Sequence, residues 1–265
     1  MPQSKRSEDP PQDNHEDTAY YIYGVVPADV DSDGDASGVG DPPGKVGVVR
    51  QGKIAALVSE VHLGRPLGTP EDLSAHQRLL DAVVTEVPVL PLRFGAVMTD
   101  ANAVKEELLA PPHDEFVAAL KELEGRAQYV VKGRYEEDAI LSEVLSEVPE
   151  AQELRQQLHG QPEDATRNIR IQLGEIINQA VTAKREHDTA KVVDALGPHA
   201  VMTAVREPTH EHDAAQVALL VELDRADELE NAVEDLVREW EGRVNVRLLG
   251  PMAAYDFVVK GDGSR

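Results

Sequence analysis

Residues 216–249, QVALLVELDRADELENAVEDLVREWEGRVNVRLL, place an amphipathic helix between two strands. The apolar runs 216–223 and 244–249 each predict a strand. Between them, residues 225–241 have the periodicity of a helix, and Gly242 ends it. The apolar side chains that share one face of this helix are Leu229, Ala232, Val233, Leu236, Val237 and Trp240.

The preceding segments extend this pattern toward the N-terminus. A strand over 128–133 is followed by helical residues 136–148, a break at Pro149, a long helix over 163–196 and a strand over 200–206. The order is β-α-β-β-α-β with an enlarged first helical connection. It predicts an α+β chain whose C-terminal domain, residues 126–250, is ferredoxin-like. Its antiparallel sheet is expected to have two helices on one face and an open second face.

The first half of the chain predicts a separate α+β domain over residues 19–125. Its expected elements are strands at 19–26, 46–49 and 54–61, a helix at 70–86, a short segment bracketed by Pro88 and Pro91, a short helix capped by Asp100 and a helix at 114–124. Residues 1–18 are acidic and are expected to be a disordered tail. Residues 251–265 are expected to be an extension that packs back on the N-terminal domain.

The composition excludes several classes of protein. A net charge of −23 over 265 residues disfavours nucleic acids and anionic membranes as partners, because both are negatively charged. No apolar run is long enough to span a bilayer, so no membrane insertion is expected. The absence of cysteine excludes disulfides and thiolate-bound metals. We therefore expect a cytoplasmic protein.

Two acidic or histidine-containing segments are candidate metal sites. Residues 29–35 begin like a calcium loop, but Gly40 occupies the position where a bidentate glutamate is required, so a solvated loop is favoured. His210-Glu211-His212 lacks helical zinc-site spacing, and a polar hairpin is the favoured interpretation. No catalytic or nucleotide-binding motif is visible, so we expect no enzyme activity, no cofactor and no bound metal.

Three short apolar segments hold the remaining candidate residues. They are YYIYGVV (20–26), VLPLRFG (89–95) and LLGPMAAYDFV (248–258). Arg93 lies between Leu92 and Phe94, where a buried guanidinium needs a partner; an ion pair that joins the domains is favoured over partner binding. The candidate residues for partner binding or domain contact are Tyr21, Tyr23, Arg93, Phe94, Gly250, Pro251, Tyr255 and Phe257.

In order and spacing, these segments resemble the gas vesicle protein F/L family (GvpF/GvpL). The resemblance spans about residues 19–259 and includes Leu173-Gly174-Glu175 in the long helix. One departure is that family members commonly carry Trp and two Pro where this chain has Met252, Ala253 and Ala254.

The resemblance implies a two-domain α+β protein with a ferredoxin-like C-terminal part. It also implies a non-enzymatic accessory or minor structural protein of gas vesicle formation, which binds the hydrophobic shell protein and other accessory proteins. Its location would be the cytoplasm and the gas vesicle. The alternative is a ferredoxin-like module that binds a small ligand or has a regulatory role. That function calls for a closed apolar pocket with a few convergent polar groups.

Overall fold

The computed structural model describes residues 18–31, 36–64, 66–162 and 166–258. Almost all of the predicted acidic tail lies outside the described residues, as do residues 32–35 of the candidate calcium loop and residues 259–265. The chain divides into two compact units. Unit 1 holds the described residues up to Leu80 together with Pro91–Ala118, and unit 2 holds Asp81–Leu90 together with the described residues from Ala119 on. Within the described part, no helix is both long and apolar enough to cross a bilayer.

Unit 1 is built on a sheet with the strand order β2-β3-β1-β4, and β5 also pairs with β1. The central strand carries the Tyr-rich segment, and its residues from Tyr21 to Val26 are all buried. The strands are β1 (Thr18–Pro27), β2 (Val46–Gln51), β3 (Ile54–His62), β4 (Leu90–Pro91) and β5 (Val97–Met98). The helices that begin in this part of the chain are α1 (Pro70–Val83), α2 (Ala101–Ala103), the π-helical η2 (Val104–Leu109) and α3 (His113–Leu123).

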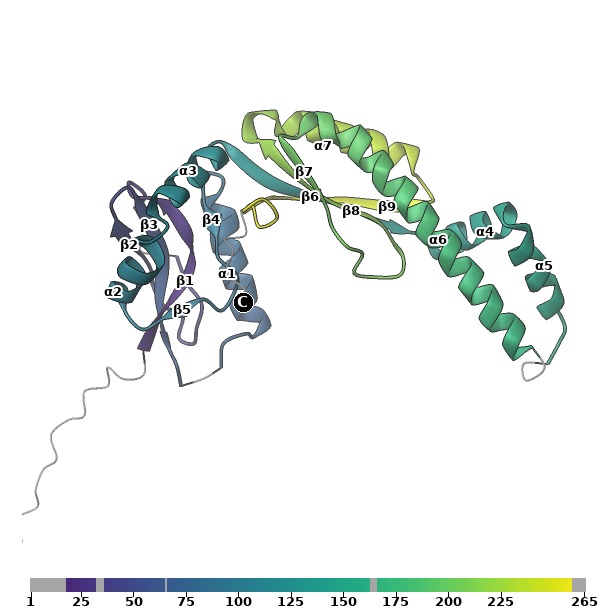
Figure 1. Cartoon of the computed structure of the whole chain (residues 1–265), viewed down its shortest axis with the longest axis horizontal. Helices are drawn as coiled ribbons and strands as arrows, with labels where there is room; N and C mark the ends of the chain where they lie inside the picture. The colour runs from purple at the N-terminus through teal and green to yellow at the C-terminus, as the bar shows by residue number, and fades with distance from the viewer. Residues whose placement is uncertain (1–17, 32–35, 65, 163–165, 259–265) are drawn as a thin grey trace, which may run out of the picture. The chain divides into compact units, whose positions relative to one another are not determined.

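Unit 2 contains a four-stranded sheet in which every neighbouring pair is antiparallel, with the order β7-β8-β6-β9 (Figure 1). Its strands are β6 (Arg126–Tyr135), β7 (Met202–Val205), β8 (Asp213–Glu222) and β9 (Val244–Met252). Three helices, α4 (Glu137–Glu147), α5 (Pro149–Leu158) and α6 (Arg167–Leu196), connect β6 to β7, and α7 (Ala226–Glu239) connects β8 to β9. Short 3-10 turns, η3 (Gly197–His199) and η4 (Leu223–Arg225), follow α6 and β8.

The helices α6 and α7 pack on the sheet through β8 and β9, and α5 packs beside α6. The helix α7 is amphipathic, with Leu229, Val233 and Leu236 buried, because its apolar residues recur at helical spacing. The predicted break at Pro149 is present, because α4 ends at Glu147 and Val148 has an extended conformation. Pro149 also begins α5, since the first helical position needs no N–H donor. The expectation of an open second face of the sheet was wrong along β8, where every residue from Asp213 to Val221 is buried.

Candidate functional site

The predicted residues Tyr21, Tyr23 and Phe94 come together in unit 1. The two tyrosines are two residues apart on β1, so they share one face of the sheet, and their ring centroids lie 4.9 Å apart. The His76 ring, from α1, stacks on Tyr23 at 5.6 Å, and Phe94 lies 5.6 Å from Tyr21. Both tyrosines are fully buried, so this cluster is part of the core of unit 1.

Polar contacts fix this cluster in one arrangement. The Tyr21 hydroxyl lies 2.9 Å from Nδ1 of His76, and the Tyr23 hydroxyl lies 2.8 Å from Oγ of Ser59 and accepts from the Val39 N–H at 2.7 Å. Burial lowers the pKa of His76, although a backbone hydrogen bond with Leu92 partly opposes this shift. The aromatic surroundings therefore disfavour the charged form of His76, and a partner-binding role for the members of this cluster stays a prediction.

Arg93 does not join this core. Its side chain is exposed, and it makes no ion pair with another described residue. The expected burial of Arg93 is therefore wrong, whereas an ion pair that joins the two domains stays a prediction. A role for Arg93 in binding a partner stays a prediction.

In unit 2, Gly250 and Pro251 form a bulge in β9. Gln128 pairs with Met252 and Val130 pairs with Leu249, so these two residues together oppose Tyr129. Gly250 has a φ of +138°, and a Cβ there would lie 2.7 Å from Cδ1 of Tyr129. Only glycine fits this position without displacing β6.

After β9, Asp256 binds the amide of Gln128. Its carboxylate accepts from Nε2 of Gln128 at 2.7 Å, and its backbone N–H donates to Oε1 at 3.0 Å. Of the two predicted aromatic residues in this segment, Tyr255 is 38% exposed and Phe257 is half-buried. The described part of the C-terminal extension, residues 251–258, thus belongs to unit 2 and contacts β6. Packing of this extension on the N-terminal domain stays a prediction.

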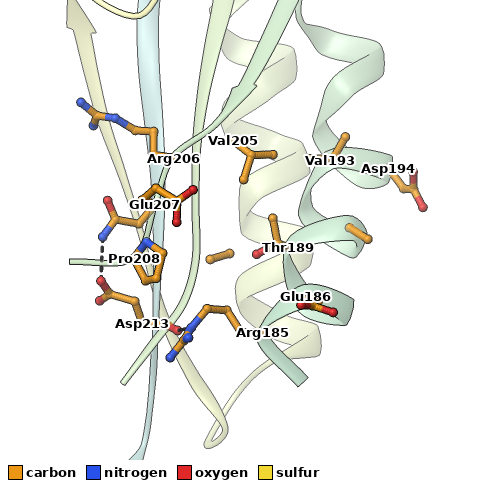
Figure 2. A pocket seen from close by; sticks show the side chains of 13 residues that line it. Arg185, Glu186, Thr189, Val193, Asp194, Val205, Arg206, Glu207, Pro208 and Asp213 are labelled. Atoms are coloured by element: carbon orange, nitrogen blue, oxygen red, sulfur yellow. Dashed lines mark hydrogen bonds between the residues drawn. The ribbon is translucent and has the colours of Figure 1, made fainter. Parts of the chain in front are cut away.

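The sequence did not predict a groove that lies between α6 and β7 in unit 2. Its hollow of about 450 Å³ has one wall from α6, with Thr189, Ala190 and Val193, and another from β7 and the residues after it, with Val205 and Pro208. Figure 2 shows these two walls on either side of the hollow. Val205 is 62% exposed, which is unusual for a valine in a strand. We regard this α6–β7 groove as the candidate functional site.

A charged network fixes α6, which forms one wall of the groove, to the sheet. Asp188 is 2% exposed and accepts from the Tyr135 hydroxyl at 2.6 Å and from an Arg243 guanidinium nitrogen at 2.9 Å. Arg243 also donates to Glu143 of α4 at 2.7 Å, and Lys184 donates to the same carboxylate at 2.6 Å. Burial and the hydrogen bond to Asp188 raise the pKa of Tyr135, so its hydroxyl stays a donor.

The loop between β7 and β8 contains the candidate metal residues and is ordered by Asp213. The Asp213 carboxylate accepts from the N–H groups of Thr209 and His210, each at 2.8 Å. Burial alone would raise the pKa of Asp213, but these donors lower it below its usual value. The His212 N–H donates to Nδ1 of His210 at 3.1 Å, and within the described residues no cluster of three or more potential ligands could hold a metal ion.

A sequence signal for the groove exists but is weak. The apolar residues 200–206 predict a strand without indicating whether it lies at an edge of the sheet. Arg206-Glu207-Pro208 directly after this strand is typical of an edge, because charge and proline discourage further pairing.

Comparison with known proteins identifies the family of this chain. The family model described as "Gas vesicle synthesis protein GvpL/GvpF" matches residues 19–259. A gas vesicle protein F from Streptomyces sp. (strain CB03234) is 33% identical over 242 residues, which cover 90% of this chain and 98% of that protein. A gas vesicle protein L from the same strain is 28% identical over 261 residues, with 91% of this chain and 93% of that protein covered.

A solved structure has the same fold. The crystal structure of GvpF from Anabaena sp. PCC7120 superposes with a TM-score of 0.73 at 22% identity and covers 90% of this chain and 97% of that one. Mixed α/β architecture with two antiparallel sheets is therefore common to both proteins. The chain belongs to the gas vesicle synthesis protein GvpL/GvpF family, and its role lies in gas vesicles.

Proposed function

We propose that this protein is a non-enzymatic accessory or minor structural protein of gas vesicle formation, which binds the hydrophobic shell protein and other accessory proteins. Family membership supports a gas vesicle role. The observation that carries the binding proposal is the α6–β7 groove, with its exposed apolar side chains beside an edge strand. We place the binding of the shell protein and of the other accessory proteins in the cytoplasm and at the gas vesicle.

The physical reason for such a protein lies in the shell subunit. Apolar surface that is exposed before assembly aggregates, and a partner that covers this surface keeps the subunit dispersed. The net charge of −23 would keep the resulting complex in solution through repulsion between complexes.

We also assign the sheet of unit 2 to the ferredoxin-like class. Two observations support this assignment: the chain order β6, helices, β7, β8, α7, β9 and the spatial order β7-β8-β6-β9. In this arrangement β7 is an edge strand by topology, so the groove beside it is a consequence of the fold.

Co-expression with the shell protein tests the proposed function. The full chain carries an affinity tag, and the soluble fraction is passed over the matching resin. We expect the shell protein to remain soluble and to elute with this chain, whereas shell protein expressed alone sediments. Shell protein that fails to co-elute, together with normal vesicles in a strain that lacks this chain, would contradict the proposal. Thermal stabilisation by a small metabolite in place of shell binding would favour the ligand-binding alternative.

A further inference from the structure

The free edge of β7 offers unpaired backbone groups. Among the described residues β7 pairs only with β8, in a register that sets Ala204 opposite Ala218 and Val205 opposite Val217. The Arg206 N–H donates to the Gln216 carbonyl at 2.9 Å. Because hydrogen-bonded pairs alternate along an antiparallel ladder, the N–H and C=O groups of Thr203 and Val205 point away from β8. They are available to another strand.

The groove continues along α6 beyond the hollow beside Val205. A second hollow, of about 330 Å³, shares Arg185 and Pro208 with the first. Together their lining extends on α6 from Asn178 to Asp194. At 1.5 Å per helical residue this is about 24 Å, which is the length of roughly seven residues of extended chain. The dimensions of the groove thus match a peptide strand better than a compact ligand.

The charges at the rim of the groove indicate the chemistry of its occupant. Glu186, Asp194 and Glu207 are exposed and make no ion pair with another described residue. The two arginines of the lining are already engaged: Arg185 donates to the carbonyls of Glu211 and Asp213, and Arg206 pairs with Asp256 at 3.3 Å. The carbonyls do not neutralise Arg185, but three carboxylates against this one unpaired guanidinium leave the rim with a net negative charge.

This negative rim argues against a second copy of the chain in the groove. A second copy paired through its own β7 would place the same three carboxylates against these, and like charges across an interface disfavour association. A segment with basic residues at its ends would instead meet charges of the opposite sign.

We propose that the α6–β7 groove binds an extended segment of a partner protein, with apolar side chains at alternating positions and a basic residue at each end, which adds to β7 as a further strand. Strand addition supplies backbone hydrogen bonds, and the apolar walls of the groove select the side chains. The identification of the partner as a gas vesicle component rests on the proposed function, whereas the mode of binding does not.

Two synthetic peptides test this proposal on the full chain. One has the sequence Lys-Val-Thr-Val-Thr-Val-Lys, and the other has glutamate in place of each lysine; both carry a fluorophore for anisotropy. We expect the lysine peptide to bind and the glutamate peptide to bind roughly tenfold more weakly or worse. No binding of the lysine peptide, or equal binding of both, would overturn the proposal.

Three variants locate the binding site. Val205→Asp puts a charge on the groove wall, and Thr203→Pro removes an outward N–H without removing a hydrogen bond to β8. Each is expected to weaken binding of the lysine peptide roughly tenfold. Val237→Asp, a matched change at a valine that is 42% exposed on α7, is expected to have no effect. Urea unfolding followed by the fluorescence of Trp240 verifies that each variant is folded. Equal loss in all three variants, or in none, would contradict the proposed site.

The outcomes separate this proposal from the proposed function. If the Val205→Asp and Thr203→Pro variants each co-elute with as much shell protein as the unchanged chain does, the groove proposal fails and the proposed function stands. If the lysine peptide binds but the shell protein does not, the proposed function fails and the groove proposal stands. A dimer of the unchanged chain that becomes a monomer in Val205→Asp would show that a second copy occupies the groove, and would overturn the proposal.

Discussion

Replacement of Asp188 by alanine is expected to loosen α6 from the sheet. The carboxylate is buried, and it connects α6 to β6 through Tyr135 and to the start of β9 through Arg243. Its removal leaves the buried Tyr135 hydroxyl without its acceptor and Arg243 with only the Glu143 carboxylate. Because α6 forms one wall of the α6–β7 groove, this change connects stability with the candidate site.

The expected cost follows from the two lost contacts. A hydrogen bond to a charged group contributes about 1.5–3 kcal/mol, and removal of one partner of a buried ion pair costs about 3–5 kcal/mol. The side chain of Arg243 is 26% exposed, so water compensates part of its charge. We therefore expect the free energy of unfolding of Asp188→Ala to fall by about 3 kcal/mol. Asp188→Asn retains an acceptor for Tyr135 and is expected to lose about 1–2 kcal/mol.

Urea unfolding followed by the fluorescence of Trp240 measures this effect. Trp240 is the only tryptophan of the chain, it is 3% exposed, and it lies in unit 2, so its signal reports on the part of the molecule that the mutation affects. Asp194→Ala is the matched control, because Asp194 is an exposed carboxylate on the same helix; its change should stay within about 0.5 kcal/mol. If Asp188→Ala and Asp194→Ala unfold at the same urea concentration, the network does not stabilise α6 and the reasoning from its contacts is refuted.

Two further predictions concern a close backbone approach and a buried histidine. Gly250→Ala places a Cβ against Tyr129 at a positive φ and is expected to lower the melting temperature. Gly174 has open space around it on α6, so Gly174→Ala is expected to raise the melting temperature slightly. Calorimetry that finds the reverse order of melting temperatures would contradict the close approach of Gly250 to Tyr129. Because the pKa of His76 is lowered in the folded chain, the unfolded chain takes up a proton at a higher pH, near 6.5, than the folded chain does. The free energy of unfolding therefore decreases as the pH falls through about 6.5. His76→Asn should flatten this decrease in melting temperature between about pH 7 and pH 5, and an unchanged slope would show that other groups cause it.

Sequence patterns predicted those helices and strands in which buried and exposed residues alternate at a clear period. The helix predicted over 225–241 is α7, Ala226–Glu239, because one face is apolar and the other charged. Asp100 caps α2, and its carboxylate accepts from the N–H groups of Asn102 and Ala103 at 2.8 Å each. The strand predicted over 244–249 continues to Met252, since Gly250 and Pro251 form a bulge rather than a stop.

The candidate site could not be predicted in the same way. Val205 has the sequence context of a core residue, but it lies in a strand at the edge of the sheet, and periodicity contains no information on which strand is at the edge. Arg93 shows the same kind of error, because its apolar neighbours in sequence suggested burial, whereas the short β4 ends at Pro91 and leaves the side chain exposed. Both outcomes depend on tertiary arrangement, which a single sequence does not specify.

Hydrogen–deuterium exchange of the full chain, with and without purified shell protein, tests the central claim most directly. We predict that binding slows amide exchange in β7, above all at Thr203 and Val205, because their outward N–H groups would acquire acceptors, while exchange in α7 stays unchanged. Exchange that remains the same throughout the chain would contradict binding of the shell protein. Protection that spares β7 and α6 would contradict the α6–β7 groove as the site.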